Sequence, residues 1–303
     1  MRIIVTGRHG QVARSLAERG ALAGHEIVRL GRPQLDLSAD PDRIVAAIEA
    51  ARPGVVVSAA AYTAVDKAES EPKLAFAVNE AGPRTVAAAA AKLDVPLVHL
   101  STDYVFDGSK SGSYVEGDQT HPTGVYGASK LAGEAALLAQ QPNSAVLRTA
   151  WVYSPFGANF VKTMLRLAGD RDEVGVVADQ YGNPSSALDI ADGILAVASN
   201  LSAGDEADKR GIFHMTASGE ASWADFAEAI FAASAGGGGP SANVRRIGTA
   251  DYPTLALRPA NSRLDCSLIE RVHGVRLPDW RDSLQIVVSR LAAAGTELNG
   301  GGR

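Results

Sequence analysis

The feature that most constrains the fold is a short apolar run followed by a glycine-rich turn at the start of the chain. Residues Ile3–Thr6 precede the sequence GRHGQVA at Gly7–Ala13, and a helix-like stretch then continues through Leu22. This glycine-x-x-glycine-x-x-alanine spacing between a strand and a helix is typical of a dinucleotide-binding turn, because Gly7 permits the tight turn and Gly10 lets backbone amides approach a pyrophosphate. The helix N-terminus adds partial positive charge. The alternative is a plain βα turn.

Beyond this turn, short β-branched runs alternate with longer alanine-rich segments. The expected strands are Ile3–Thr6, Glu26–Leu30, Val55–Ser58, Pro96–Leu100 and Ala145–Arg148. Continuous apolar strands separated by helices predict a parallel sheet covered on both faces. We therefore expect an α/β fold: a doubly wound parallel-sheet Rossmann domain with a smaller C-terminal α/β substrate-binding lobe.

The strand-helix alternation weakens after residue 150, where proline-rich loops and mixed elements begin. A short strand at 211–215 falls in this second part. The glycine-rich end of the chain has nothing to pack against, so it is expected to be flexible. The predicted division is an NAD(P)-binding Rossmann domain at 1–150 to which 176–205 return, a substrate-binding lobe at 151–175 and 206–292, and a flexible tail at 293–303.

Composition excludes several classes of protein. The net charge is −5, with 29 basic residues interspersed among 34 acidic ones, so no broad positive field is available for nucleic acid. A single cysteine, Cys266, rules out an intrachain disulfide and a thiol-rich metal cluster. No apolar run reaches the length of a membrane span. We expect a cytoplasmic protein with a small-molecule substrate and neither nucleic-acid nor membrane partners.

A tyrosine and a lysine four residues apart are the strongest catalytic candidates. Tyr126 and Lys130 share one face of an expected helix. An adjacent ammonium favours the phenolate, so we expect the pKa of Tyr126 to be lowered, and Tyr126 to protonate a developing alkoxide while Lys130 anchors the nicotinamide ribose. Thr102, at the end of the fourth strand, can donate a second hydrogen bond to that oxygen. The alternatives are an exposed helix pair and a helix cap.

Further residues are expected to contact the cofactor. The second strand ends without a carboxylate, and Arg32 is suited to a ribose 2′-phosphate, which favours NADPH while leaving NADH possible. The alternative for Arg32 is a solvated side chain. The small residues after the third strand let a cofactor lie against the backbone. The remaining expected cofactor contacts are Asp36 and Leu37 beside the adenine, Ala60, Ala61, Tyr62 and Thr63 after the third strand, and Leu100.

From Met1 to about Leu291 the sequence resembles the extended short-chain dehydrogenase/reductases, and within them the dTDP-4-dehydrorhamnose reductase family. The superfamily motifs are GRHGQV at 7–12, AAAYTAVDKAE at 59–69, STDYVF at 101–106 and YGASK at 126–130. The more specific motifs are AYTAVDKAE at 61–69, RTAWVY at 148–153, DQYGNP at 179–184 and RPANSRL at 258–264. The resemblance implies NAD(P)H-dependent reduction of the 4-keto group of dTDP-6-deoxy-L-lyxo-4-hexulose to give dTDP-L-rhamnose.

The resemblance also implies roles for individual residues. Thr102, Tyr126 and Lys130 correspond to a catalytic triad, and Thr102, Asp103 and Trp151 to substrate contacts. Trp151 offers a flat wall for a deoxysugar, with a core position as the alternative. Arg263 suits a diphosphate or a structural salt bridge. The residues implied to touch the cofactor are Gly10, Gln11, Val12, Ala61, Tyr62 and Thr63.

Two departures from the family pattern concern the cofactor and a metal. Gly31-Arg32 stands where some members carry an acidic residue, which leaves NADH or NADPH open. Some members also dimerise through a magnesium ion held by glutamates, and Ser15 stands at one expected ligand position, so we expect no metal. Both a monomer and a homodimer agree with the sequence.

Other functions of the same superfamily remain alternatives at this point. They are another sugar-nucleotide reductase or epimerase, or a non-catalytic NADP-binding regulatory subunit. A dehydratase is disfavoured because Asp103 is followed by Tyr104 and not by the glutamate that eliminates water in that family. The intact Thr102, Tyr126 and Lys130 argue against the regulatory subunit.

Arg32→Asp tests the assignment of the ribose phosphate. Because the substitution replaces a cation with an anion, NADPH affinity should fall by at least about tenfold more than NADH affinity. Titrating each reduced cofactor against the protein by fluorescence measures both constants. Equal weakening of the two would show that Arg32 does not contact the phosphate.

Overall fold

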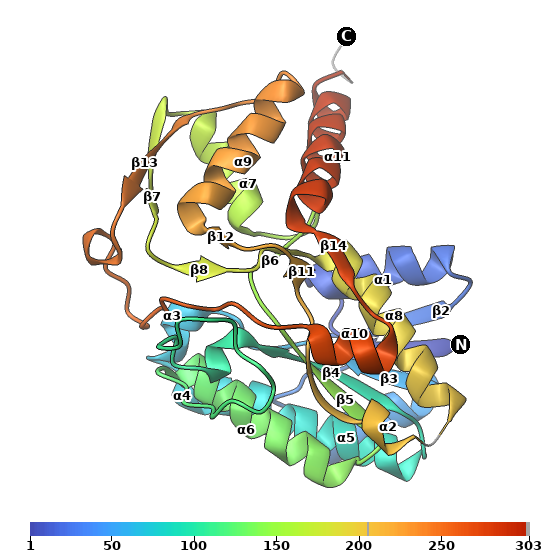
Figure 1. Ribbon diagram of the computed structural model, residues 1–303. Helices are drawn as coiled ribbons and strands as arrows, with labels where there is room; N and C mark the ends of the chain where they lie inside the picture. Colours follow the sequence, from blue (N-terminus) through green and yellow to red (C-terminus); the bar gives the residue numbers. More distant parts are fainter. Residues whose placement is uncertain (205, 301–303) are drawn as a thin grey trace.

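A parallel sheet forms the centre of the larger part of the molecule (Figure 1). The computed structural model describes residues 1–204 and 206–300. Within them the large sheet has six strands in the order β10-β5-β4-β3-β1-β2, and every neighbouring pair is parallel. The bounds are β1 Arg2–Thr6, β2 Glu26–Leu30, β3 Val55–Ser58, β4 Leu97–Thr102, β5 Ser144–Thr149 and β10 Gly211–His214. The expected Rossmann-type parallel sheet is confirmed.

Helices cover both faces of the sheet because alternate strand residues point to opposite sides. Val55 and Val57 pack in the core beneath α1 and α8, whereas Val56 packs in the core beneath α2 and α5. Both cores are apolar and fully buried, as expected for a doubly wound sheet. The helices are α1 Gln11–Leu22 and α8 Ala187–Ala203 on one face, and α2 Pro41–Ala51, α5 Gly82–Lys92 and α6 Val125–Gln140 on the other.

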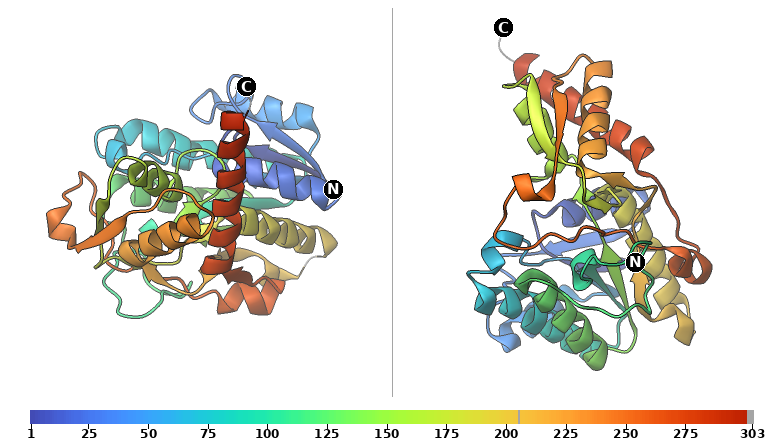
Figure 2. Two further views of the ribbon diagram at one scale, coloured as in Figure 1. Left: turned by 90° about the horizontal axis from the view of Figure 1, so that it is seen from above. Right: turned by 60° about the vertical axis from the view of Figure 1, so that its left-hand side comes forward.

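A smaller lobe stands over the carboxyl edge of the sheet (Figure 2). Its parallel pair of strands packs against α9, whose N-terminus has a capping box between Ser222 and Asp225. Phe160, Trp223 and Phe226 form an aromatic cluster inside this lobe. The elements of the lobe are β7 Glu173–Val177, β13 Asn243–Ile247, α7 Phe160–Ala168, α9 Trp223–Gly236 and α11 Trp280–Gly300.

Short elements connect these two parts and complete the chain. They are α3 Val65–Ala68, α4 Pro72–Phe76, the π-helical turn η1 Ala77–Ala81, the 3-10 turns η2 Asp103–Val105, η3 Ala207–Lys209 and η4 Thr249–Asp251, α10 Ser267–His273, and strands β6 Val152–Tyr153, β8 Tyr181–Gly182, β9 Ser185–Ser186, β11 Ala217–Ser218, β12 Ala221–Ser222 and β14 Leu277–Asp279. In the described part of the chain, none of the helices combines the length and apolarity needed to span a bilayer.

Two segments differ from the division expected from the sequence. The strand expected at 211–215 in the smaller lobe is β10, which pairs with β5 and extends the large sheet. A four-residue strand carries no local signal of its partner, so only the tertiary structure decides where it pairs. The expected flexible tail at 293–303 is helical as far as Gly300, where α11 ends, and residues 301–303 lie outside the described part.

Helix α6 approaches its neighbours closely because two of its residues have no side chain. A Cβ atom on Gly127 would lie 2.1 Å from the carbonyl oxygen of Tyr104, and one on Gly133 would lie 2.0 Å from that of Asn79. Both distances are far below van der Waals contact, so only glycine allows this packing. Gly127 therefore sets the distance between α6 and η2, which follows β4, and Gly133 sets the distance between α6 and η1.

Gly133→Ala tests this close packing. Alanine favours a helix by about 1 kcal/mol over glycine, yet the clash with Asn79 should lower the free energy of unfolding by about 1–3 kcal/mol. Gly236→Ala is the matched control, because Gly236 is also helical but has open space around it. Urea unfolding should show destabilisation for Gly133→Ala and no loss for Gly236→Ala. Equal stability of the two variants would contradict the packing.

Candidate active site

The turn between β1 and α1 has the features of an anion site. Gly7 has a φ of 104°, which favours glycine, and its N–H donates to the carbonyl of Leu30 over 2.6 Å. Gly10 is the N-cap of α1, with no side-chain cap, and open space lies where its Cβ would be. The first N–H groups of α1 are thus left to bind a phosphate. The residues fit the pyrophosphate of a dinucleotide.

The side chain of Gln11 has a different environment from the cofactor contact that the sequence suggested. Its Nε2 donates to the carbonyl of Val152 over 3.2 Å, and its Oε1 accepts from Ser154 and Asn159 over 2.8 and 2.9 Å. The side chain therefore ties α1 to the segment that enters the smaller lobe. Only the backbone of Gln11 remains for the cofactor, while the side chain of Val12 packs against the core.

Three arginines surround the end of β2. Arg32 pairs with Asp36 over 2.9 Å, and 71% of its side chain is exposed. Arg29 donates to the carbonyl of Arg8 over 2.8 Å, which holds Arg8 beside the glycine turn. Sequence reasoning singled out Arg32 and missed Arg8 and Arg29. Leu37, by contrast, is buried in the core beneath α2 and α5, so its side chain is removed from any ligand.

Hydrogen bonds from β1 and η1 fix the loop after β3. Thr6 Oγ1 accepts from the N–H groups of Ala59 and Ala60 over 3.0 and 3.1 Å, which joins the ends of β1 and β3. Asn79, fully buried in η1, accepts from the N–H of Tyr62 and donates to Ser129 on α6. The loop is thus held between the glycine turn and α6. Ala61 is half-buried and Thr63 is exposed.

Thr102 and Tyr126 meet at the carboxyl end of β4. The Thr102 hydroxyl donates to Asp103 over 3.0 Å, and Tyr126 interacts with Thr102 through its side chain. Tyr104 packs edge-on against Tyr126, with ring centroids 5.5 Å apart. Burial raises the pKa of Tyr126 against the opposing effect of Thr102, and the charges of Asp103 and Tyr104 raise it further. The downward shift expected from the sequence is therefore wrong for this structure.

The Lys130 ammonium faces the sheet rather than the tyrosine. It donates to the carbonyl of Leu100 over 2.6 Å and lies 3.3 Å from Nε2 of His99. Burial lowers the pKa of Lys130 to about 8, and the charge of Glu134 opposes this shift. Leu100 thus contributes a backbone carbonyl, and His99 is a neighbour that the sequence motifs did not indicate.

Asp103 and Arg258 each keep a buried polar atom without a protein partner among the described residues. These atoms are Asp103 Oδ2 and Arg258 NH1. Burial raises the pKa of Asp103 to about 6 despite side-chain hydrogen bonds from Ser262 and Thr102. Arg258 is held by Asp66 over 2.6 Å and also interacts with Tyr104. Arg258 was missed as a site residue, although its motif was part of the family resemblance.

Trp151 and Arg263 are both engaged by protein groups. Trp151 stacks on Trp223 with centroids 3.5 Å apart and planes at 7°, and its φ of 47° is unusual for a residue with a side chain. Arg263 donates to Asn261, Glu220 and the carbonyl of Ser111. These three partners correspond to the structural alternative for Arg263 considered from the sequence. One face of Trp151 is covered, and Trp223 is an aromatic partner that sequence reasoning missed.

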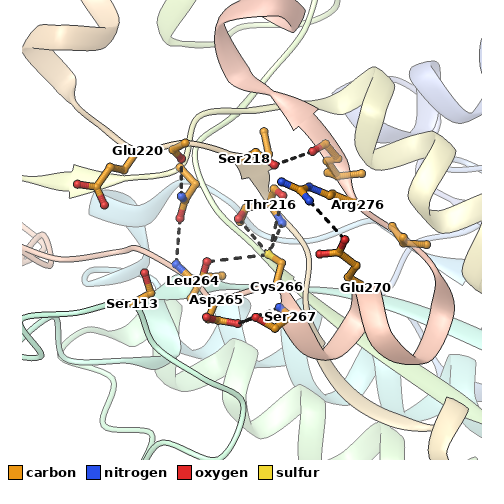
Figure 3. Close-up of a pocket in the computed structure, with 15 residues that line it drawn as sticks. Ser113, Thr216, Ser218, Glu220, Leu264, Asp265, Cys266, Ser267, Glu270 and Arg276 are labelled. Atoms are coloured by element: carbon orange, nitrogen blue, oxygen red, sulfur yellow. Dashed lines mark hydrogen bonds and ion pairs between the residues drawn. The ribbon is translucent and has the colours of Figure 1, made fainter.

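A separate cavity of about 380 Å³ lies beside α10 (Figure 3). Polar groups line it, with Cys266 hydrogen-bonded to Thr216 and Glu270 paired with Arg276. None of the residues expected from the sequence lines this cavity. In the described ranges, no group of three or more His, Cys, Asp or Glu side chains is arranged to hold a metal ion. Ser15, at the expected magnesium position, is buried in α1.

Comparisons with known proteins show the family of this chain. The family model described as the RmlD substrate binding domain matches residues 1–293. The chain is 51% identical to a dTDP-4-dehydrorhamnose reductase of Sinorhizobium fredii over 98% of this chain and 100% of that protein. The chain belongs to the dTDP-4-dehydrorhamnose reductase family.

Other relatives support the assignment to the reductase family. An Escherichia coli dTDP-4-dehydrorhamnose reductase is 38% identical over 96% of this chain and 98% of that protein. The crystal structure of a Bacillus anthracis dTDP-4-dehydrorhamnose reductase in complex with NADP has a TM-score of 0.88 and 32% identity, covering 95% of this chain and 99% of that chain. The family resemblance derived from the sequence motifs is thus confirmed.

Asp103→Asn tests the burial of the carboxyl group. A native pKa of about 6, above an ordinary value near ~4, means that the wild type loses stability as the pH rises from about 4 to about 6. The variant lacks this cost, so its stability relative to the wild type should increase by up to about 3 kcal/mol between pH 4 and pH 7. Urea unfolding at several pH values measures the difference.

Asp107→Asn is the control for this measurement. Hydrogen bonds from Ser109 and Tyr114 lower the pKa of Asp107, so its carboxylate stabilises the fold above its pKa. The relative stability of this variant should therefore change with pH in the opposite direction. A stability difference for Asp103→Asn that does not vary with pH would show that the carboxyl group titrates normally.

Proposed function

We propose that this chain is an NADPH-dependent dTDP-4-dehydrorhamnose reductase. It reduces the keto group at carbon 4 of dTDP-6-deoxy-L-lyxo-4-hexulose and gives dTDP-L-rhamnose. The carrying observation is that Thr102 and Tyr126 meet at the same carboxyl edge of the sheet as the dinucleotide turn, and that Lys130, one helical turn after Tyr126, is fixed to Leu100 of β4. In doubly wound sheets this edge is where ligands bind. The names of the full-length relatives support the same activity.

Thr102, Tyr126 and Lys130 are the proposed catalytic residues. The reduced nicotinamide supplies the hydride when it is bound. Tyr126 gives its proton to the oxygen of the sugar ketone as the negative charge develops there, and the hydroxyl of Thr102 donates a hydrogen bond to the same oxygen. The phenol of Tyr126 is protonated at neutral pH, as a proton donor has to be, and burial raises its pKa further. Lys130 provides a fixed positive charge beside the ribose.

The cofactor is proposed to be NADPH, with NADH as a possible substitute. Arg29 and Arg32 lie at the end of β2 and Arg8 lies in the glycine turn beside it, and they support this preference because the 2′-phosphate of NADPH is expected on this side of the fold. The Bacillus anthracis relative was crystallised with NADP. Asp36 is paired with Arg32 and would have to share that guanidinium with the phosphate.

For the substrate, Thr102, Asp103 and Trp151 are the proposed contacts. Trp151 has one face against Trp223 and its ring also contacts Gly182, so only the part of the ring that stays exposed is proposed to meet the apolar side of a deoxysugar. The unpaired Oδ2 of Asp103 is a ready acceptor for a sugar hydroxyl. Arg263 remains a weaker candidate for the diphosphate because its guanidinium has three protein partners.

An assay with the keto sugar nucleotide tests the proposal and its alternatives. The purified protein should oxidise one NADPH for each dTDP-L-rhamnose formed, followed by the loss of nicotinamide absorbance. An epimerase would keep its cofactor and consume none, and a regulatory subunit would bind NADPH without turnover. Either result would exclude the reductase. The dTDP-linked substrate should also be preferred over a UDP-linked one.

Tyr126→Phe tests the proton donor. The substitution removes only the hydroxyl, so NADPH affinity should stay within a few-fold while kcat falls by about 100-fold or more. Single-turnover absorbance measurements give the hydride-transfer rate, and fluorescence titration gives the affinity. Tyr114→Phe is a control, since the Tyr114 hydroxyl donates to Asp107 and not to the catalytic residues. Near-normal turnover of Tyr126→Phe would refute the assignment.

A further inference from the structure

A buried chain of hydrogen bonds runs from Lys130 into the sheet. The Lys130 ammonium donates to the carbonyl of Leu100 over 2.6 Å and lies 3.3 Å from Nε2 of His99. On its other side, Nδ1 of His99 lies 3.0 Å from Oγ of Ser58. Lys130 is 2% exposed and His99 is 0% exposed. The chain therefore links α6, β4 and β3 without contact with solvent.

The chemistry of these groups fixes which atom donates. An ammonium has three hydrogens and no lone pair, so Nε2 of His99 has to be the acceptor. A neutral imidazole carries its hydrogen on the other nitrogen, and Nδ1 therefore donates to Ser58. Two of the three Lys130 hydrogens are used by β4, through Leu100 and His99. Neither of these two bonds uses the third hydrogen of the ammonium.

We propose that His99 is a positioning residue, which holds the Lys130 ammonium charged and directs its remaining hydrogen toward the cofactor. This inference rests on the proposed reductase function for its catalytic consequence. His99 itself touches neither the cofactor nor the substrate in this role. It acts through Lys130, and Ser58 in turn fixes the imidazole.

Because Lys130 is buried, its charged form depends on hydrogen-bond acceptors such as Nε2 of His99. Burial lowers the pKa of Lys130 to about 8, so loss of one more hydrogen bond would bring it below neutral pH. Burial and the Lys130 charge hold the pKa of His99 well below its ordinary value, which keeps the imidazole neutral. The ionisable groups near Lys130 are Glu134 and Tyr126 on α6, Asp103 after β4, and Arg148 on β5, which is paired with Glu134.

Three substitutions at His99 distinguish a role in positioning Lys130 from a role in core packing alone. His99→Leu keeps the bulk and removes both nitrogens. His99→Gln places an amide near the position of Nε2 and restores an acceptor for Lys130. His99→Asn places its amide near Nδ1, so it contacts Ser58 but does not reach Lys130. His214→Leu is the matched control, because His214 is equally buried but lies on β10 away from Lys130.

The pH dependence of kcat/KM for NADPH is the decisive measurement. In His99→Leu and His99→Asn the descending limb should move to lower pH by about one unit or more, because a hydrogen bond to a charged group is lost. His99→Gln should keep the wild-type limb, and so should His214→Leu. If His99→Leu does not fold, the descending limb of His99→Gln is compared with that of His99→Asn, and a difference between them supports the positioning role. Identical limbs for Gln and Asn, or a wild-type limb for a folded Leu variant, would overturn the inference.

Nitrogen-15 NMR of histidine-labelled protein gives a readout that does not require turnover. The His99 resonances, assigned by their absence in His99→Gln, should show a neutral ring with its hydrogen on Nδ1 between pH 5 and pH 7, where Lys130 is charged. A hydrogen on Nε2, or an imidazolium at pH 6, would contradict the hydrogen-bond chain. If the wild type binds NADPH but fails to reduce the keto sugar nucleotide, the proposed function fails, while the NMR result and the pH dependence of NADPH binding still test His99.

Discussion

The close packing of α6 against its neighbouring segments is the constraint on which the site depends. Tyr126 and Lys130 both lie on this helix, whereas Thr102 ends β4. Their separation is set by how near α6 approaches η2 after β4, where Gly127 allows backbone contact, and Gly133 allows a similar contact with η1. A shift of about 1 Å is enough to disrupt a catalytic geometry of this kind. The two glycines therefore act on the chemistry through backbone packing alone.

Buried polar groups beneath the site hold α6 in this position, and their burial costs desolvation energy. Glu134 and Arg148 form an ion pair that is only 2% exposed on each side, with bonds of 2.7 and 3.0 Å, and Ser101 also donates to Glu134. A buried pair of this kind gives little net stability, because desolvation offsets the attraction. Its geometry is nevertheless directional, since a two-point guanidinium contact permits one orientation of α6 on β5. The pair thus contributes more to alignment than to stability.

The sequence predicts what depends on local periodicity, and less of what depends on partners far along the chain. Strands β1, β2 and β3 agree with the predicted strands to within one residue, because their apolar runs are bounded by glycine turns. The pairing of β10 with β5 joins segments about sixty residues apart and leaves no local trace. The partners of Gln11 and Arg263 are similarly remote, so a motif identified these residues but did not indicate what their side chains contact.

The pKa of Tyr126 shows why a motif alone does not determine the properties of a site. The spacing of Tyr126 and Lys130 suggested a phenolate favoured by a nearby ammonium, and that argument counted charge but not burial. In the structure the ammonium faces Leu100 and His99, and burial dominates the pKa of the phenol. A protonated tyrosine is the form needed to reduce a ketone, whereas oxidation of an alcohol needs the phenolate. The buried site therefore keeps Tyr126 in its protonated form at neutral pH.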